Sequence, residues 1–437
     1  MFKKVIYCIS VYLLSSGLPA ADLVELFNQA QYSDPIYKQA IAAYNAATEA
    51  KPQARSQLLP QISLNANTYS HDQDISSSSG IGGSGTVDFN THGYSLDLTQ
   101  PVFHYDRWLA LRQADNEILQ AQAEQDAALQ ELIIRVSERY FNLLAANDNL
   151  EFVRAEKSSL ARQLEQATQR FEVGLSTITD VHEAQAGYDS SVANEILAEN
   201  QIDNAREALW ETTGTYVDNL SSLGESMALV QPQPGVIDEW TEIARVQNLQ
   251  VIAAQYQLEQ ARQEISIQRS GHLPSLDIVA NRGYNTSGGR FGGTETHSTA
   301  IGLELSVPLY EGGLVNSLTR EAQHLHTQAL ERLEQEFRAA QRDTREAYLG
   351  VISGISQVNA LKQSVISNES ALQATEAGFE VGTRTAVDVV AVQRSLSQAK
   401  RDYARARYNY VMNTLRLKQA SGTLSPEDLY EVNKWLE

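Results

Sequence analysis

The sequence contains almost no cysteine, and this absence excludes several kinds of chemistry. The only cysteine among the 437 residues is Cys8, inside a short apolar segment near the start of the chain. This segment follows two lysines and ends in small residues at Ala20 and Ala21, which is the pattern of a secretory signal peptide over residues 1–21. Once that peptide is removed no cysteine remains, so disulfides, thiolate metal sites and cysteine nucleophiles are excluded together.

Basic residues and long apolar segments are also scarce. The chain has 34 lysines and arginines against 54 aspartates and glutamates, a formal net charge of -20. This balance argues against a nucleic-acid partner, because contacts with phosphate need a basic face. After the signal peptide, no segment approaches the roughly 20 consecutive apolar residues that a membrane-spanning helix needs.

Sequence motifs of enzymes and metal sites are missing as well. The chain has no GxxxxGK(S/T), HExxH or GxSxG arrangement. His324 and His326 stand two residues apart, so on a helix they do not share a face as metal ligands would. The sequence therefore predicts a protein that is not an enzyme and has no cofactor and no metal.

Two long segments lack proline and have little glycine. They run from about Asp106 to Glu172 and from about Val315 to Glu380. Apolar residues and alanines recur there mostly in steps of three and four, which predicts long coiled-coil helices. At ~1.5 Å per residue, each segment of about 67 residues reaches on the order of 100 Å, more than a compact globular core requires.

The chain is duplicated. Phe171–Gly174 recurs as Phe379–Gly382, 208 residues later, and Asp180 matches Asp388 at the same spacing. The period is far longer than that of solenoid repeats and indicates duplication of one large unit. The predicted organisation after the signal peptide is repeat 1 at 22–213, a linker at 214–237, repeat 2 at 238–422 and a C-terminal segment at 423–437.

Each repeat contains two stretches in which apolar and polar residues alternate. In the first stretch Ile62 and Leu64 alternate with Ser63 and Asn65, which is typical of a strand. The four predicted strands cover residues 61–71, 93–102, 275–285 and 299–309. At roughly ten residues, each has the length that a tilted strand needs to cross a bilayer.

Glycine-rich loops, Ser76–Gly85 and Gly288–Gly293, separate the two strands of each repeat. Four strands cannot close into a barrel, and open strand edges are not tolerated in lipid, so the barrel must be shared between chains. The predicted fold is a mixed α and β membrane protein. Aromatic residues near the predicted strand ends fit the interfacial positions of such a barrel, and they are Tyr94, Phe103, Tyr284 and Tyr310.

The segments between the long helices carry the most specific motifs, Gln169–Val181 in repeat 1 and Gly378–Val390 in repeat 2. With the duplicated order of helices and strands, they resemble the TolC family of outer-membrane factors over essentially the whole mature chain. The resemblance implies a homotrimer with a 12-stranded β-barrel in outer-membrane lipid, four strands per chain, continued by an α-helical barrel in the periplasm. It also implies a periplasmic membrane-fusion adaptor and an inner-membrane pump of RND, ABC or MFS type as partners.

The resemblance also implies a gate at the helix ends. In the family, contacts between neighbouring hairpins close the tip, and the matching positions here include Arg384, which would bind Thr179 and Asp180, and Gln163 as a further partner. Asp388 would form a ring of negative charge under three-fold symmetry. Two positions depart from the family pattern: Phe379 replaces a tyrosine, and Ala391 replaces the aspartate of a second ring.

The tip turns at 173–176 and 381–384 are where the family meets its adaptor. The expected docking residues are Val173, Gly174, Leu175, Val381, Gly382 and Thr383. Glycine at the second of these positions in each turn permits the tight reversal between antiparallel helices.

Three alternative interpretations remain. Taken alone, Arg384 and Asp388 are spaced as a solvated ion pair on one helix face. A soluble periplasmic coiled-coil scaffold or adaptor would explain the long helices, but not the four alternating strands. The cargo is also open, because multidrug efflux and type I protein secretion fit the sequence equally well.

Overall fold

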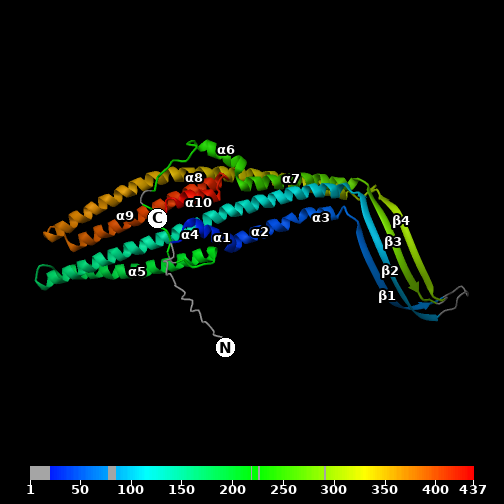
Figure 1. The fold of residues 1–437 in the computed structure, drawn as a ribbon, viewed down its shortest axis with the longest axis horizontal. Helices are drawn as coiled ribbons and strands as arrows, with labels where there is room; N and C mark the ends of the chain where they lie inside the picture. Colours follow the sequence, from blue (N-terminus) through cyan, green and yellow to red (C-terminus); the bar gives the residue numbers. More distant parts are fainter. Residues whose placement is uncertain (1–19, 77–84, 218, 225–226, 290–291) are drawn as a thin grey trace, which may run out of the picture. The chain divides into compact units, whose positions relative to one another are not determined.

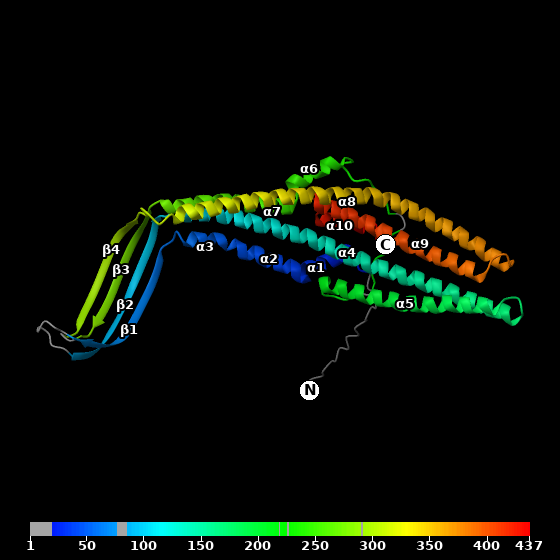
Figure 2. The same cartoon turned by 180° about the vertical axis from the view of Figure 1, so that it is seen from behind.

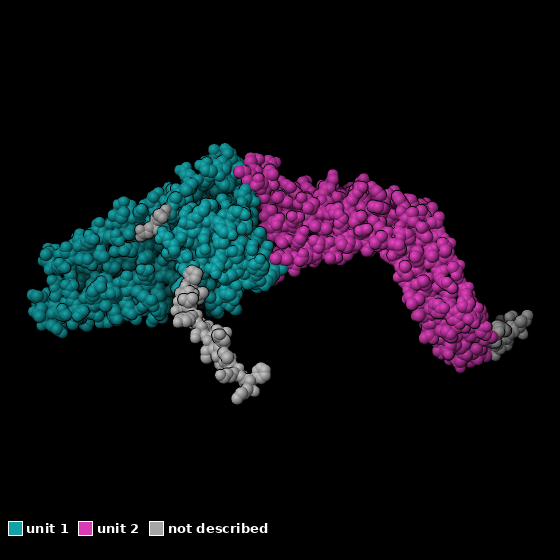
Figure 3. Space-filling model, viewed as in Figure 1, with its two compact units in different colours: residues 1–38, 129–241, 343–437 teal, residues 39–128, 242–342 magenta. Residues whose placement is uncertain are grey.

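The computed structural model describes residues 20–76, 85–217, 219–224, 227–289 and 292–437. The predicted signal peptide, apart from its last two residues, and most of the Ser76–Gly85 loop lie outside these ranges. The chain divides into two compact units, coloured separately in Figure 3. Unit 1 comprises residues 1–38, 129–241 and 343–437, and unit 2 comprises residues 39–128 and 242–342.

The described residues form four strands, ten α-helices and one short 3₁₀ helix (Figure 1). In chain order these are α1 Leu23–Ser33, α2 Pro35–Thr48, α3 Ala50–Ser56, β1 Gln61–Ile75, β2 Gly85–Phe103, α4 Tyr105–Glu172, α5 Ile178–Thr213, α6 Ile237–Gln247, α7 Leu249–Arg269, η1 Ser270–His272, β3 Ser275–Ser287, β4 Thr294–Ser306, α8 Leu314–Glu380, α9 Ala386–Ala420 and α10 Pro426–Asn433. No helix in the described ranges is both long enough and apolar enough to cross a membrane.

Unit 2 contains a four-stranded antiparallel sheet in the order β1-β2-β3-β4 (Figures 1 and 2). Its register aligns Leu64 on β1 with Leu96 on β2, then Arg282 on β3 and Thr299 on β4. The strands β1 and β4 form the two edges, and each has a neighbour on one side only. Within one chain the sheet therefore stays open.

The two faces of the sheet differ in polarity, because side chains alternate along each strand. One face gathers apolar side chains from all four strands, and these include Ile62, Leu64, Leu96, Ile278, Ile301 and Leu303. The other face is polar. There Asp97 accepts hydrogen bonds from Asn65 at 3.0 Å and from Ser95 at 2.8 Å, and also from Asn281, so the polar network joins three strands.

The strand bounds differ most from the predicted ones at four ends, which are the end of β1, the start of β2 and both ends of β4. The β1–β2 ladder continues to Ile75 and Gly85, beyond the predicted ends at 71 and 93. Residues 71–74 of β1 are all polar, and on β2 the apolar residues Val87 and Phe89 lie on the face opposite to Leu96, so the backbone pairing continues where the side-chain alternation changes face. The strand β4 covers 294–306 instead of 299–309, because Pro308 has no N–H to donate to a ladder.

The apolar core of unit 1 gathers the short terminal helices around the long ones. Leu23 of α1, Leu132 of α4, Leu209 of α5, Leu415 of α9 and Leu429 of α10 are all almost completely buried. A full Leu side chain in such a place contributes about 1.5–3 kcal/mol. This core holds segments from both repeats and the C-terminal segment in one cluster.

A buried ion pair fixes the junction between α1 and α2 onto α4. The Asp34 carboxylate is buried and accepts from Arg135 Nη2 at 2.9 Å and from Nε at 3.2 Å. The planar fork of arginine matches a carboxylate in this two-bond geometry. The middle of α4 is therefore held against the first helices of the chain by a directional contact as well as by apolar packing.

Candidate functional site

The candidate site is the pair of tip turns, at which the antiparallel pairs α4–α5 and α8–α9 reverse direction (Figure 1). In the first turn Gly174 has φ +78°, its N–H donates to Phe171 O at 2.9 Å, and Leu175 N–H donates to Arg170 O at 2.8 Å. This pattern is a Schellman motif, in which the left-handed residue is usually glycine. It leaves Val173 and Leu175 69% and 77% exposed.

The second turn repeats the same geometry. Gly382 has φ +80° and donates to Phe379 O at 3.1 Å, while Thr383 N–H donates to Gly378 O at 2.8 Å. Val381 is 75% exposed. The two tips thus expose the apolar side chains of Val173, Leu175 and Val381 to solvent, which suits contact with another protein.

Each following helix begins with a capping box, which accounts for both aspartates of the predicted gate. Asp180 accepts hydrogen bonds from the Ser176 hydroxyl at 2.7 Å and from Thr177 N–H at 3.0 Å. Asp388 accepts from the N–H and the hydroxyl of Thr385 at 2.9 and 3.0 Å. Within a single chain, both carboxylates therefore cap the N-termini of α5 and α9.

The same hydrogen bonds lower the pKa of both aspartates, because they stabilise the ionised form. For Asp180 the largest effect comes from Ser176, followed by Thr177. For Asp388 it comes from Thr385, and the positive charge of Arg384 adds a smaller effect. Asp388 is consequently a carboxylate at neutral pH, as a ring of negative charge requires.

The other predicted gate residues are not joined to one another within one chain. Arg384 and Thr179 are exposed, and no described hydrogen bond or ion pair connects the Arg384 side chain with Thr179 or Asp180. The Oε1 atom of Gln163 is buried and has no hydrogen-bond partner among the described residues. The predicted contacts of Arg384 and Gln163 concern neighbouring hairpins and stay predictions.

Within the chain, a different residue joins the two hairpins, namely Arg170 at the end of α4. Its guanidinium carbon lies 4.8 Å from the ring centroid of Phe379, within the range of a cation–π interaction. Its Nη1 and Nη2 donate to the carbonyls of Phe379 and Glu380 at 3.2 and 3.3 Å. Both carbonyls lie in the last turn of α8, where Phe379 O also accepts from Gly382 N–H, so the cation complements the negative end of the helix dipole.

The sequence prediction missed Arg170, although the duplication holds a signal for it. At the spacing of 208 residues, Arg170 corresponds to Gly378, and Ser176 corresponds to Arg384. A Cβ added to Gly378 would lie 2.8 Å from Arg384 Cγ, so the glycine makes room for that arginine. The repeats therefore differ at the tips in which turn position carries the cation.

Behind the tips the helices approach closely through small residues. Gly187 of α5 faces Val390 of α9 and Leu160 of α4, and a Cβ there would lie 3.6–3.7 Å from both. Farther along, the carboxylate of Glu156 on α4 lies 3.8 Å from Arg401 of α9. Together these contacts link the α4–α5 pair to the α8–α9 pair inside unit 1.

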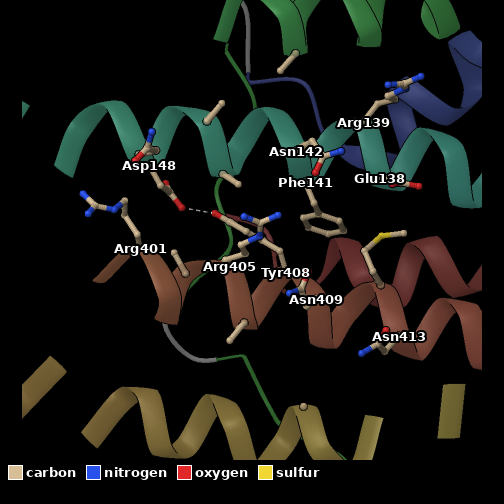
Figure 4. Close-up of a pocket in the computed structure, with 18 of the residues that line it drawn as sticks. Glu138, Arg139, Phe141, Asn142, Asp148, Arg401, Arg405, Tyr408, Asn409 and Asn413 are labelled. Atoms are coloured by element: carbon tan, nitrogen blue, oxygen red, sulfur yellow. Dashed lines mark hydrogen bonds between the residues drawn. The ribbon is translucent and has the colours of Figure 1, made fainter. Parts of the chain in front are cut away.

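A hollow of about 840 Å³ lies between α4, α5, α8 and α9 (Figure 4). Tyr408 donates a hydrogen bond of 2.6 Å to Asp148 at this hollow, drawn as a dashed line in the figure. Burial raises the pKa of Asp148, while the bond from Tyr408 opposes that effect. Amides and arginines form a large part of the remaining lining, among them Asn142, Gln201, Asn204, Gln357, Asn409 and Arg405, and alanines with Phe141, Phe152 and Met412 form much of the rest.

This hollow has no arrangement suited to catalysis or metal binding. Clusters of three or more potential metal ligands do not occur among the residues that the structure describes. Arg416 lies 3.8 Å from Glu138 and Arg139 lies 3.7 Å from Glu211, so these charges form exposed ion pairs of small energy. The lining mixes amide and charged side chains with apolar ones, and the amide and charged groups can be hydrated.

Comparison with known proteins identifies what this architecture resembles. Residues 26–215 and 240–423 match the family described as outer membrane efflux protein. The outer membrane protein TolC of Vibrio cholerae is 41% identical over 430 residues, covering 97% of this chain and 96% of that protein. The alkaline protease secretion protein AprF of Pseudomonas aeruginosa is 27% identical over 421 residues, covering 95% of this chain and 88% of that protein.

A solved structure has the same fold. The CmeC outer membrane channel of Campylobacter jejuni superposes with a TM-score of 0.79 and covers 95% of this chain and 90% of its own chain, at 17% sequence identity. At that identity the agreement concerns the fold alone. Both matched segments of the family correspond to the two repeats and omit most of the linker between them.

Proposed function

Because this chain belongs to the family of outer membrane efflux proteins, we propose that it is one subunit of an exit duct in the outer membrane. The protein is a channel component and not an enzyme. It acts with a periplasmic adaptor and an inner-membrane pump, as members of efflux and secretion systems do. The finer features of the duct are proposed from the geometry of the single chain.

The observation that carries the proposal is the open four-stranded sheet with one apolar and one polar face. In lipid, unpaired strand edges are not tolerated, so β1 of one chain must pair with β4 of the next. Three chains then make a closed, multi-pass barrel of 12 strands, with the apolar face toward lipid and the Asp97 network toward the lumen. The functional protein is a homotrimer in outer-membrane lipid.

The long helices continue the duct on the periplasmic side. In each chain α4, α5, α8 and α9 enclose a hollow of about 840 Å³, and three chains would surround a wetted passage. Cargo crosses this passage without chemical change. The family description as efflux protein and a relative named for protease secretion support a cargo range that includes both efflux substrates and secreted proteins.

The tips form the gate and the docking surface. Arg384, exposed and without a side-chain hydrogen bond or ion pair in the described part of its own chain, binds Asp180 and Thr179 of a neighbouring hairpin, and Gln163 supplies a further contact. Asp388 from three chains forms the ring at the constriction, while Phe379 is held within the chain by Arg170. The adaptor contacts the exposed tip residues, which are Val173, Gly174, Leu175, Val381, Gly382 and Thr383.

Fractionation of the membranes and a conductance measurement test this function. The expected result is recovery in the outer membrane, migration as a trimer that separates on heating, and single-channel currents in planar bilayers. A soluble periplasmic monomer without channel activity would support the scaffold alternative and overturn the proposal.

The docking surface can be tested with single cysteines, because the mature sequence contains none. Val173→Cys or Val381→Cys should crosslink to the adaptor. Gln166→Cys, at an exposed position on α4 before the tip, serves as the matched control and should crosslink much less. Equal crosslinking at all three positions would contradict docking at the tips.

A further inference from the structure

The apolar face of the sheet carries one feature that a lipid-facing surface does not explain, the arginine Arg282. Side chains on this face come from every second residue, and on β3 the series runs Leu276, Ile278, Ala280, Arg282 and Tyr284. Arg282 is thus on the same face as the leucines and isoleucines. Its cross-strand neighbours are Leu96 on β2 and Thr299 on β4.

The side chain of Arg282 is exposed and has no hydrogen bond or ion pair among the described residues. A neighbouring subunit cannot supply a partner readily, because β3 is an inner strand and the proposed junction between chains lies at β1 and β4. The carboxylate nearest along this face is Glu295, which pairs in register with Thr286, two layers farther on, and lies 3.5 Å from His297. The contacts of the guanidinium must therefore come from the medium that surrounds the sheet.

The position of Arg282 is at the boundary of the apolar surface. On β4, the same face changes from Leu303 and Ile301 to Thr299, His297 and Glu295 toward the loop end of the hairpin. A lipid-facing arginine costs about 2–4 kcal/mol at the middle of a bilayer and about 0–1 kcal/mol near its surface. The boundary layer is therefore a place where an arginine can reach the headgroups.

Aromatic side chains mark the same level. Tyr94 and Tyr284 stack with ring centroids 5.4 Å apart, one layer beyond Arg282, and His297 lies 5.0 Å from Tyr284. Tyrosines gather at the membrane–water interface, where the ring contacts the acyl chains and the hydroxyl reaches water. Two independent features, the end of the apolar series and the stacked tyrosines, thus place the guanidinium at headgroup depth.

We propose that Arg282 binds the phosphate group of a membrane lipid in the leaflet on the loop side of the sheet. A guanidinium forms two parallel hydrogen bonds to phosphate oxygens, and a dianionic or monoanionic phosphate matches its charge. The site rests on the proposed function, since it requires that the sheet crosses the membrane with its apolar face in lipid. Each chain supplies one such site.

Native mass spectrometry of the purified full-length protein tests this site with lipid A as the phosphorylated probe and diacylglycerol, which has acyl chains but no phosphate, as the comparison lipid. Arg282→Gln should lower the retention of lipid A about three- to tenfold, the range expected for loss of a charged hydrogen-bond pair at an exposed position. Arg282→Lys should retain an intermediate amount, and diacylglycerol retention should not change. Arg320→Gln, which removes an exposed arginine of α8, is the matched control and should retain lipid A as the unaltered protein does.

Unchanged lipid A retention by Arg282→Gln, or an equal loss in Arg320→Gln, would overturn the proposal. Displacement of lipid A by inorganic phosphate alone would also overturn it, because a lipid site needs the acyl chains as well as the phosphate. The conductance of Arg282→Gln separates this result from failure of the proposed function. If the unaltered protein forms channels and Arg282→Gln does too, only the lipid site is at stake; if neither forms channels, the exit duct itself is wrong.

Discussion

Removal of the Arg170 guanidinium should loosen the closed tip. Arg170→Ala removes a cation–π contact with Phe379 and two hydrogen bonds to carbonyls at the end of α8. An exposed cation–π contact contributes about 0.5–1 kcal/mol, and each exposed charged hydrogen bond adds a few tenths to about 1 kcal/mol. The sum is about 1–3 kcal/mol per chain, which corresponds to a shift of roughly tenfold or more between the closed and loosened arrangements.

Single-channel recording in planar bilayers, without adaptor or pump, measures this shift. Arg170→Ala should spend a larger fraction of time in higher-conductance states than the unaltered protein. Arg170→Lys keeps the charge but loses the planar fork, so its effect should be intermediate. Arg162→Ala is the matched control, because Arg162 is an exposed residue of α4 whose described contact is only a 3.4 Å hydrogen bond to the Ser158 hydroxyl.

A double-mutant cycle decides whether the contact with Phe379 is responsible. Phe379→Leu removes the ring but keeps the backbone carbonyls, so the double variant with Arg170→Ala should be less affected than the two single effects combined. Strict additivity would mean that the ring and the guanidinium do not interact. Conductance of Arg170→Ala equal to that of Arg162→Ala would refute the whole argument.

Three other predictions concern the gate and the hollow. Arg384→Ala should make the channel leaky, because Arg384 is the proposed partner of Asp180 across hairpins, and unchanged conductance would count against that contact. Multivalent cations should block this pore less strongly than a pore with two carboxylate rings, and block that persists equally after Asp388→Ala would eliminate the ring. Because burial raises the pKa of Asp148, its contribution to stability is present below the ordinary aspartate pKa and declines as the pH rises through the raised pKa. Asp148→Asn should therefore flatten the dependence of Tm on pH in that window, and a profile that keeps its slope would exclude Asp148 as the cause.

The sequence predicted the elements that depend on regular spacing. Segments without proline and with apolar residues every three or four positions became α4 and α8, and alternation at Ile62 and Leu64 marked β1. The strand ends were less predictable because the pattern of side chains changes while the backbone ladder continues. Residues 71–74 of β1 are all polar, and Val87 and Phe89 of β2 lie on the face opposite to Leu96.

Contacts between distant residues could not be predicted in the same way. Arg170 and Phe379 are 209 residues apart, and in the sequence Arg170 is only a polar residue before a turn. Arg282 was missed for a related reason. Its place on the apolar face follows from the register with Leu96 and Thr299, which depends on pairing between strands rather than on composition.

The duplication gives the tips a common backbone and different contacts. Both turns use a glycine at positive φ and a capping aspartate, so Gly174 with Asp180 and Gly382 with Asp388 are structural equivalents. The cation, however, stands before the turn in repeat 1 and after it in repeat 2. Arg170 contacts the C-terminal end of α8 within its own chain, whereas Arg384 stays exposed.

This difference lets one duplicated hairpin serve two purposes. A contact within the chain, such as that of Arg170 with Phe379, can hold the two hairpins of a subunit together while the tip opens. A contact between chains, as proposed for Arg384 with Asp180, must break for the tip to open. Both Arg170→Ala and Arg384→Ala should be leaky without the adaptor. When the adaptor already holds the tip open, only Arg384→Ala should lose its effect, because the contact between chains that it removes is then already broken.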